Sequence, residues 1–419
     1  MVNVNSFKGS NDSEIINKAI ENKEADGIVI IPPRESDVEP ERKFWLLDSA
    51  ILLTENTTVI LQNCKIKLSD NCRDNFFRSA NCGIGIELPE RIKNIHIKGE
   101  GYCLLEGADH PRAVGDSSKL LHNPCPHYPE DICKVADWIP EERRTPETID
   151  FRDIHDHSYG TDAGKEGESQ YGDWRGIGIL LANVEDFSIS NLRLKDFHCW
   201  AISVEECANG RIEKIDFDAC MHKDIDGIVM NMENQDGVDI RNGCHHIVIS
   251  DITGHTGDDV IALTAIADQE YRPGGSMRST HVMHNDWSKR ERDIHDIIIK
   301  NVIAHSYLCY TVRLLPALTK IYNVVIDGVI DTSPNCQAAG GTILLGDGGR
   351  YGENLPDSMK NVTISNVICN SRKAIFMRGY LTDSTITNVI NKNPDCEALH
   401  VVREDGLNNV AVGNLITAK

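Results

Sequence analysis

Three aspartates are the residues of this chain with the clearest potential for chemistry. Asp236 lies in the segment NQDGVDI, and Asp258 and Asp259 lie in TGDDVIAL, with Asp258 22 residues after Asp236. Carboxyl groups held close together cannot all ionise freely, so one of them keeps a proton at neutral pH and can donate it. A proton donor beside an ionised carboxylate that activates water is the pair that breaks a glycosidic bond.

A single aspartate in such a position is more often structural, because its side chain bonds the local backbone at a turn. Three acids in neighbouring repeats favour chemistry instead. His281 lies about one repeat further along the chain and is a fourth catalytic candidate, with His284 as a rival. The run HDH at 155–157 resembles a pair of metal ligands but has no third ligand beside it. We therefore predict neither a metal site nor a cofactor.

The elements that must position these residues are short strands with one repeated signature, an Asn or Asp followed by alternating aliphatic residues. Central aliphatic residues of neighbouring copies, such as Ile364 and Ile386, lie about 22 residues apart, which is the period of a solenoid. Stacked coils pair their backbones and share one aliphatic core. We therefore predict an all-β fold, a right-handed parallel β-helix. The copies are NIHI (94–97), DFSISNL (186–192), HIVISDI (246–252), DIIIKNV (296–302), NVVIDGV (323–329), NVTISNV (361–367) and NNVAVGNL (408–415).

Two other repetitive β folds fit less well. A β-sandwich would show hairpin turns such as Asn-Gly between its strands, and a leucine-rich repeat would show a ladder of leucines. In a β-helix, a separation of one coil predicts that Asp236 and Asp258 lie in register, about 4.8 Å apart along the stack. Gly257 allows a bend that turns Asp258 and Asp259 towards the same side, which a regular strand would not do.

We expect a single domain over residues 1–419, with the main catalytic coils at 176–419. Residues 105–175 interrupt the repeat as a long loop insertion, and insertions of this length are often lids or contact surfaces. Its residues Trp138 and Trp174 would be costly to expose to water. We therefore expect the insertion to form a wall of the cleft or a subunit contact.

Residues 1–35 are expected to form the N-terminal cap and the first coil. Asn11 followed by Glu14 is the signature of a capping box that starts a short helix. The apolar stripe of this helix would cover the open end of the solenoid core. The stripe consists of Ile15, Ile16, Ala19 and Ile20.

The composition narrows the range of partners. A net charge of −21 argues against nucleic acid, because phosphate binding needs clustered Lys and Arg. The fourteen cysteines lack the paired spacing of a structural zinc site. No segment approaches the roughly 20 apolar residues of a membrane span, so no membrane contact is expected. The N-terminus shows no secretory signal. We expect the cysteines to be free and buried and the protein to be cytoplasmic, or secreted if a signal was removed. We also expect that the protein can form a homo-oligomer.

Over nearly its whole length, the sequence resembles glycoside hydrolase family 28, the polygalacturonase-like family of parallel β-helix proteins. The family's Asn-Thr-Asp motif corresponds to residues 234–236, and its Gly-Asp-Asp motif corresponds to residues 257–259. The resemblance implies an inverting glycoside hydrolase of a pectin-related or other plant saccharide. It makes Asp258 the general acid, and it assigns activation of the attacking water to Asp236 and Asp259.

Two further motifs of the family are only partly kept. Its Gly-His-Gly motif corresponds to residues 280–282 and retains His281, and its Arg-Ile-Lys motif corresponds to residues 313–315 and retains Arg313. Leu315 stands where the resemblance calls for a lysine.

In the family, the arginine and the lysine together would clamp the carboxylate of galacturonate. Loss of the lysine therefore predicts a neutral or masked sugar next to the cleaved bond. We expect Asn234, Arg313 and Tyr351 to bind substrate, with Tyr351 as a stacking platform for a sugar ring.

Two other classes of function remain open. A β-helix lyase, epimerase or intramolecular glycosyl transferase would use the carboxylates differently, and lyases often need calcium, for which the sequence offers no compact acidic cage. A non-catalytic glycan-binding solenoid would leave the spacing of the acids as coincidence. Replacing the aspartates separates this last possibility from an enzyme, because binding alone requires no turnover.

Overall fold

The computed structural model describes most of the chain in four stretches. They are residues 1–109 except 71, 73, 84, 85 and 87; 173–266 except 198, 221, 226, 227 and 232–234; 281–282; and 292–418 except 335–339, 347, 349 and 350. None of the helices in these stretches is long and apolar enough to cross a membrane.

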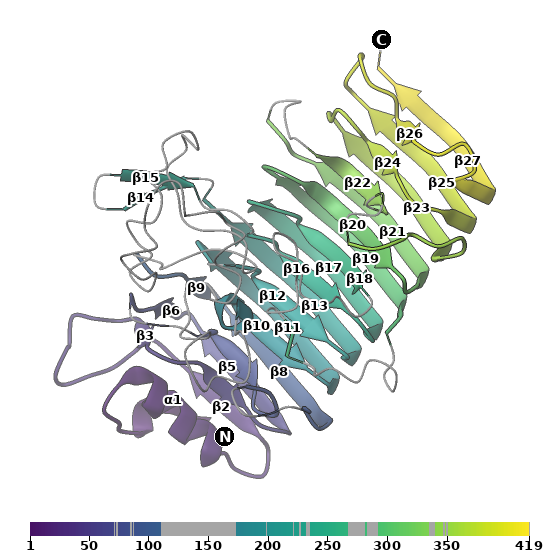
Figure 1. Cartoon of the computed structure of the whole chain (residues 1–419). Coiled ribbons are helices and arrows are strands. Elements are labelled where there is room, and N and C mark those ends of the chain that lie inside the picture. Colours follow the sequence, from purple (N-terminus) through teal and green to yellow (C-terminus); the bar gives the residue numbers. More distant parts are fainter. Residues whose placement is uncertain are drawn as a thin grey trace, which may run out of the picture. The chain divides into compact units, whose positions relative to one another are not determined.

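The described strands form a parallel β-helix, which confirms the fold class predicted from the repeat (Figure 1). Among the described strand pairs, only β14 with β15 is antiparallel. The chain forms two compact units. The first comprises residues 1–203, 218–235 and 270–284, and the second comprises 204–217, 236–269 and 285–419. The single domain expected for the whole chain stays a prediction.

The first unit contains the N-terminal helix and the early coils. One sheet has the strand order β1-β2-β5-β8-β11, with β3-β6-β9 also joined to β11, and the other has the order β4-β7-β10. The elements are η1 (Val4–Ser6), α1 (Asp12–Glu21), β1 (Val2–Asn3), β2 (Ile28–Ile31), β3 (Trp45–Leu47), β4 (Ile51–Leu53), β5 (Thr57–Gln62), β6 (Lys65–Leu68), β7 (Phe77–Ser79), β8 (Ile92–Glu100), β9 (Leu104–Glu106), η5 (Asp173–Gly176), β10 (Ile179–Ala182), β11 (Val184–Lys195), β14 (His222–Ile225) and β15 (Ile228–Asn231).

Helix α1 begins as the sequence predicts. The side chain of Asn11 accepts the N–H of Glu14 at 2.9 Å, whereas the Glu14 carboxylate accepts the N–H of Ser10 at 2.6 Å. The box is therefore closed one residue earlier than in the usual pattern. Ile15 is only half-buried, and the rest of the predicted stripe is buried, where α1 contacts β2, β3 and β4. These buried residues are Ile16, Ala19 and Ile20.

Of the two tryptophans in the predicted insertion, Trp138 lies outside the described residues. Trp174, on η5, is buried, with the guanidinium carbon of Arg78 4.9 Å from its ring centroid. A cation over an indole ring is a favourable contact. That residues 105–175 form a wall of the cleft or a subunit contact stays a prediction.

The second unit contains the later coils in two sheets. The orders are β13-β17-β19-β21-β23-β25-β27 and β16-β18-β20-β22-β24-β26, and β12 (Ile202–Glu205) lies where the chain passes between the units. The strands are β13 (Ala208–Asp218), β16 (Val238–Arg241), β17 (His245–Thr256), β18 (Ile261–Ile266), β19 (Ile294–Ser306), β20 (Tyr310–Ala317), β21 (Ile321–Asp331), β22 (Gly341–Leu345), β23 (Met359–Cys369), β24 (Ile375–Met377), β25 (Leu381–Asn391), β26 (Leu399–Val401) and β27 (Leu407–Thr417).

The core of the second unit is a set of aliphatic columns. Each central isoleucine of the repeat pairs in register with that of the next coil, and all members of the column are fully buried. Burying one such side chain contributes roughly 1.5–3 kcal/mol relative to leaving it exposed. The sequence period and the packing thus have the same cause. The column consists of Ile249, Ile299, Ile326, Ile364 and Ile386.

The polar residue of the repeat lies in a left-handed backbone conformation. Asp296, Asn323 and Asn361 have φ of 56°, 55° and 55°, which Asn and Asp adopt at lower cost than other residues with a side chain. Their side chains also bond along the stack, from Asn323 to Asp296 at 2.8 Å and from Asn361 to Asn323 at 2.9 Å. The Asn or Asp in the signature therefore bends the strand and joins one coil to the next.

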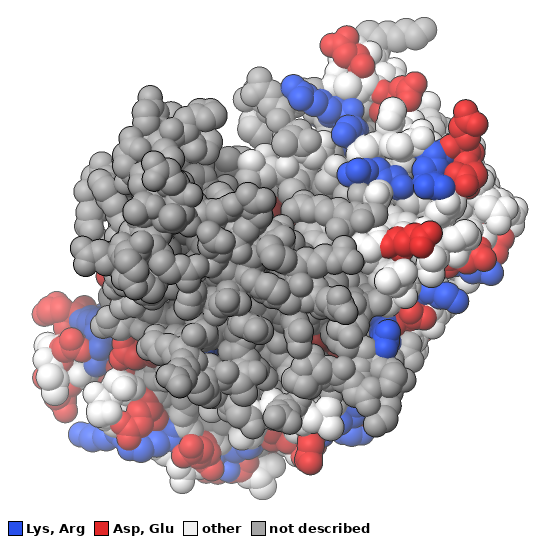
Figure 2. Space-filling view, in the orientation of Figure 1, with Lys and Arg blue, Asp and Glu red and all other residues white. Residues whose placement is uncertain are grey.

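All the cysteines that the structure describes are free thiols, and most of them are buried, as the sequence predicts. Acidic and basic side chains are interspersed on the described part of the face shown in Figure 2.

Candidate active site

Asp258 and Asp259 lie in the short connection between β17 and β18. The hydroxyl of Thr256 donates to the backbone carbonyl of Asp258 at 2.6 Å, and the N–H of Asp259 donates to the Asp258 carboxylate at 3.0 Å. These bonds fix the irregular backbone that Gly257 was expected to allow. Asp258 is 8% exposed and Asp259 only 1%.

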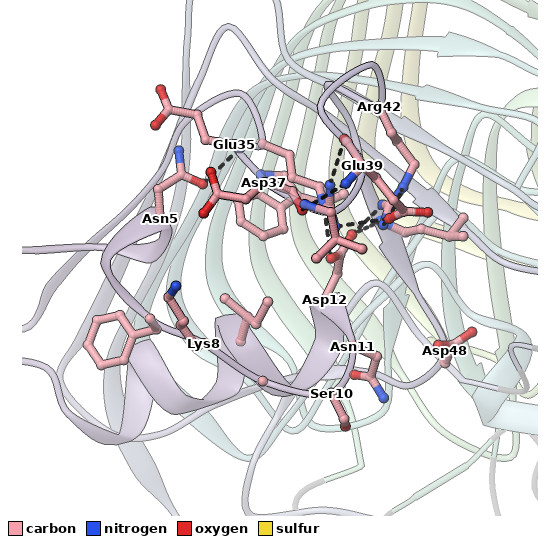
Figure 3. A pocket seen from close by; sticks show the side chains of 18 residues that line it. Asn5, Lys8, Ser10, Asn11, Asp12, Glu35, Asp37, Glu39, Arg42 and Asp48 are labelled. Carbon is pink, nitrogen blue, oxygen red and sulfur yellow. Dashed lines mark hydrogen bonds and ion pairs between the residues drawn. The ribbon is translucent and has the colours of Figure 1, made fainter.

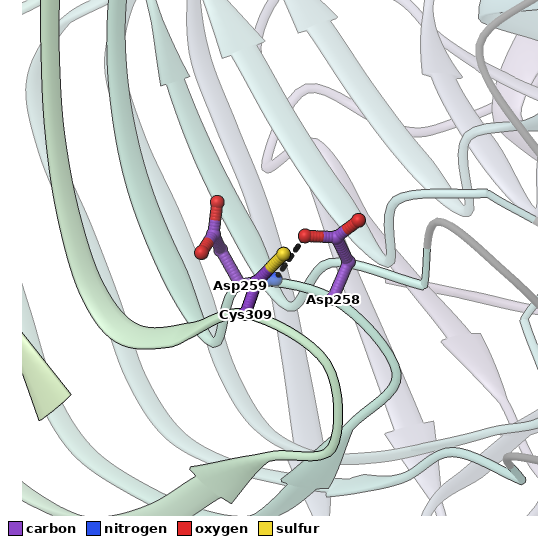
Figure 4. Close-up of side chains that lie close together, drawn as sticks. All are labelled: Asp258, Asp259 and Cys309. Atoms are coloured by element: carbon purple, nitrogen blue, oxygen red, sulfur yellow. Dashed lines mark hydrogen bonds between the residues drawn. The ribbon is translucent and has the colours of Figure 1, made fainter. Parts of the chain in front are cut away.

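Cys309 joins the two aspartates from the next coil, immediately before β20 (Figure 4). Its Sγ and one carboxylate oxygen of each aspartate all lie within 4.8 Å of one another. Burial raises the pKa of the thiol well above its usual range, and the charges of Asp258 and Asp259 raise it further, so Cys309 stays protonated. Sequence reasoning missed this residue, because the long segment before β19 hides the fact that it lies one coil after Asp258.

Arg313, on β20, holds Asp259. Its Nη1 lies 3.0 Å from one carboxylate oxygen, and the N–H of Tyr310 donates to the other at 2.9 Å. Burial raises the pKa of Asp259 to about 6, against the lowering effect of Arg313. Burial alone would lower the pKa of Arg313, but Asp259 raises it well above its usual range, so the guanidinium stays charged. Arg313, predicted to bind substrate, is therefore also a partner of the acid cluster, which consists of Asp258, Asp259 and Cys309.

Tyr351 lies against the same arginine, with the guanidinium carbon of Arg313 5.7 Å from its ring centroid. The structure thus brings together two of the three predicted substrate ligands. The third, Asn234, lies outside the described residues. A stacking role for Tyr351 towards a sugar stays a prediction.

Asp239, on β16, is a buried acid that sequence reasoning passed over. Asp239 pairs in register with Ala262 on β18, and Ala262 pairs with Arg313 on β20. All three side chains therefore lie on one face of the sheet. Burial raises the pKa of Asp239 well above the usual range, Arg241 lowers it, and Asp259 raises it again. The signal was present in the sequence, because Asp239 is the second aspartate of the segment NQDGVDI.

Asp236 is buried, but its predicted register is wrong by one residue. Val238 pairs with Ile261, so this coil has 23 residues, and the N–H of Gly237 donates to the carbonyl of Asp259 at 2.8 Å. Continuing this register places Asp236 level with Asp259 rather than with Asp258.

His281 is half-buried and belongs to the first unit, whereas the acid cluster belongs to the second. Its catalytic role stays a prediction. His284 and the HDH run at 155–157 lie outside the described residues.

Within the described stretches, the acid cluster is also the only set of three Asp, Glu, His or Cys residues close enough to hold a metal ion. The positive charge of Arg313 on Asp259 opposes a cation there.

A pocket of about 510 Å³ lies in the first unit beside α1 (Figure 3). Asp12, at its wall, accepts Nε–H of Arg34 at 2.9 Å and the N–H of Leu46 at 2.8 Å, and it also pairs with Arg42. Both carboxylate oxygens of Asp12 thus have partners. We interpret this network as the structural link between the N-terminal helix and the first coil.

The fold and the buried acid cluster define a class of protein, the parallel β-helix with a carboxylate site. Residues 163–272 match the model of Glycosyl hydrolases family 28, so the resemblance to this family is confirmed. The match supports hydrolysis of a glycosidic bond. No curated protein matches the chain significantly in sequence.

Solved structures show the same fold at low identity. A polygalacturonase from Erwinia carotovora ssp. carotovora has a TM-score of 0.55 at 14% identity, covering 98% of this chain and 95% of that one. A hyperthermoactive exopolygalacturonase from Thermotoga maritima has a TM-score of 0.51 at 14% identity, covering 99% and 92%. The surface protein and adhesin PfbA of Streptococcus pneumoniae has a TM-score of 0.52 at 14% identity, covering 100% and 98%. These likenesses establish the fold alone.

Proposed function

We propose that the protein is an inverting glycoside hydrolase in which Asp258 protonates the leaving oxygen. The observation that carries the proposal is the cluster of Asp258, Asp259 and Cys309. The two aspartates lie within residues 163–272, which match the family, and Cys309 lies beside them from the next coil. Asp258 is the more exposed of the two aspartates, so its carboxyl is the one that a substrate oxygen can approach. Water exclusion around it strengthens each electrostatic contact.

The attacking water is assigned to Asp236 and Asp259. Inversion requires about 6.5–9.5 Å between the acid and the base, to leave room for the water. Asp258 and Asp259 have oxygens within 4.8 Å of each other, which is too close for this gap. Both oxygens of Asp259 are also engaged by Arg313 and Tyr310. Asp236 is therefore the better candidate for the base, with Asp259 orienting the water.

The sugar next to the cleaved bond is expected to be neutral or masked. Leu315 is 1% exposed and offers no charge, and the guanidinium of Arg313 is engaged by Asp259. A uronate carboxylate there would lack one charge-assisted hydrogen bond, worth roughly 1.5–3 kcal/mol. We therefore expect polygalacturonate to be a poor substrate compared with neutral oligosaccharides of plant cell walls.

The test is a panel of neutral and uronic oligosaccharides, with the anomer of the first product followed by NMR. Inversion of configuration supports the proposal, and retention contradicts the mechanism. Formation of an unsaturated sugar would indicate a lyase, and rearrangement without net hydrolysis would indicate an epimerase or a transferase. Tight binding of a glycan that is never cleaved would leave a non-catalytic solenoid.

A further inference from the structure

Two cations of the second unit stand beside β24 with no acidic partner among the described residues. Lys373 precedes β24 and Arg378 follows it, and both side chains are half-buried. Some other cations of this unit pair with an acid, such as Lys360 with Asp383 at 3.1 Å. Lys373 and Arg378 differ from the other cations described there because both lie over one aromatic ring. In a chain with a net charge of −21, two half-buried cations on one ring are a local concentration of positive charge.

The ring of Phe376 holds both cations. The Nζ of Lys373 lies 4.0 Å and the guanidinium carbon of Arg378 lies 5.7 Å from its centroid. Phe376 is itself 7% exposed, so the ring is fixed by the surrounding structure. A cation held by an aromatic ring keeps its N–H donors available, whereas a cation in an ion pair does not.

Arg378 stands in the column of Leu315, the position at which the clamp for a carboxylate is incomplete. Leu314 pairs with Leu345, and Leu345 pairs with Met377, so the residues that follow them, Leu315, Gly346 and Arg378, continue one column. The distance along this column is two strand spacings, roughly 10 Å. Gly346 lies between them and has no side chain of its own, but the Oδ1 of Asn354 lies 2.6 Å from where its Cβ would be and fills the adjoining space.

The charge of Arg378 extends towards the catalytic residues. Burial raises the pKa of Tyr310 to about 12, and the charge of Arg378 acts against this rise. Tyr310 is the residue whose N–H donates to Asp259. The guanidinium also packs on Gly348, where a Cβ atom would lie 2.8 Å from its Nη2. Arg378 is thus held within electrostatic reach of the Tyr310 phenol.

We propose that Arg378 and Lys373 form a subsite for a sugar residue that carries an anionic group, either a carboxylate or a sulfate ester. The subsite rests on the proposed function, because it selects a substrate with a neutral sugar at the cleaved bond and an anionic sugar further along the chain. Arg378 supplies the planar fork that binds two oxygens of such a group, and Lys373 supplies a second positive charge. Phe376 keeps both groups in place.

The experiment measures binding by calorimetry with protein that carries Asp258→Asn, so that saccharides stay intact. The ligands are trigalacturonate, a 6-sulfated galactotriose and unmodified galactotriose. Arg378→Gln is compared with Arg372→Gln, which removes the same charge from an exposed neighbour. We expect Arg378→Gln to weaken binding of at least one anionic ligand about 10- to 100-fold and to leave galactotriose unchanged, with no effect of Arg372→Gln. Whichever anion depends on Arg378 identifies the source of the charge.

Equal weakening of galactotriose, an unchanged affinity for both anions, or no measurable binding of either anion overturns the subsite. Turnover is measured separately on the same ligands with protein that keeps Asp258, with and without Arg378→Gln. Hydrolysis that is indifferent to Arg378 would leave the hydrolase and remove the subsite. Anion binding that depends on Arg378 in a protein without any hydrolytic activity would keep the subsite and remove the hydrolase. Thermal unfolding of each variant verifies that it is folded.

Discussion

The two sheets of the second unit use the same stacked coils in opposite ways. In the sheet from β13 to β27, a column repeats one kind of residue, with isoleucine inside and Asn or Asp at the bends. In the sheet from β16 to β26, the core face is equally aliphatic, but the other face changes from coil to coil. That changing column consists of Asp239, Ala262, Arg313, Leu344 and Phe376.

The contrast has a physical cause. An aliphatic column or an amide ladder is most stable when each residue meets its own kind in the next coil. A buried charge instead requires an unlike partner, as Asp259 finds in Arg313. Repetition therefore indicates stability, and a departure from it indicates a site.

The largest expected effect is on turnover. Asp258→Asn should lower kcat about 10²- to 10⁴-fold, because the amide cannot donate a proton as a carboxylic acid does. The matched control is Asp251→Asn on β17, an exposed residue whose left-handed φ of 57° suits asparagine. Steady-state kinetics on a cleaved oligosaccharide provide the measurement. Full activity of a folded Asp258→Asn protein would exclude Asp258 as the acid.

Arg313→Met removes the member of the changing column that forms the buried ion pair with Asp259. We expect the free energy of unfolding to fall by up to about 3–5 kcal/mol at a pH well above 6, because Asp259 is left buried without its cation. The folded pKa of Asp259, already raised to about 6, would rise further above its unfolded value. The protonated form needs no partner, so the loss is smallest in acid and grows as the pH rises above about 6. Urea unfolding at several pH values measures this, and a loss independent of pH would contradict it.

Ile364→Ala tests the repeating column. We expect a loss of roughly 2–5 kcal/mol in the free energy of unfolding and little change in kcat, because a cavity forms far from any reacting group. Ile368→Ala is the control on the same strand, since Ile368 is 37% exposed and should change stability little. A fall in kcat as large as that of Asp258→Asn in folded Ile364→Ala protein would show that the two sheets do not divide their roles.

The smallest expected effect is at a bend of the amide ladder. Asn361→Ala should cost about 1–2 kcal/mol, because alanine resists the φ of 55° and cannot bond Asn323. Asn361→Gly keeps the conformation accessible and loses only the bond, so it should cost less than alanine. Thermal unfolding orders the three proteins. If glycine proves as costly as alanine, the bond matters more than the backbone angle.

The repeat made the fold predictable from the sequence, because a parallel β-helix applies the same pattern of burial to every coil. The N-terminal helix was predictable for a similar reason, since Asn11 and Glu14 satisfy local backbone groups near them in the chain. Asp258 and Asp259 were recognisable because they are adjacent in the sequence, so their proximity does not depend on how the coils stack.

The partners of those acids depended on the tertiary structure. Cys309 lies 50 residues after Asp259, and its position beside the acids follows from which coil stacks on which. The register of Asp236 depended on one residue of coil length, which composition and motif do not reveal. The engagement of Arg313 by Asp259 likewise appears only when two coils meet. The sequence alone thus determined the repeat and the residues able to react, whereas stacking decided which charges face one another, because side chains in neighbouring coils meet through register and not through proximity in the chain.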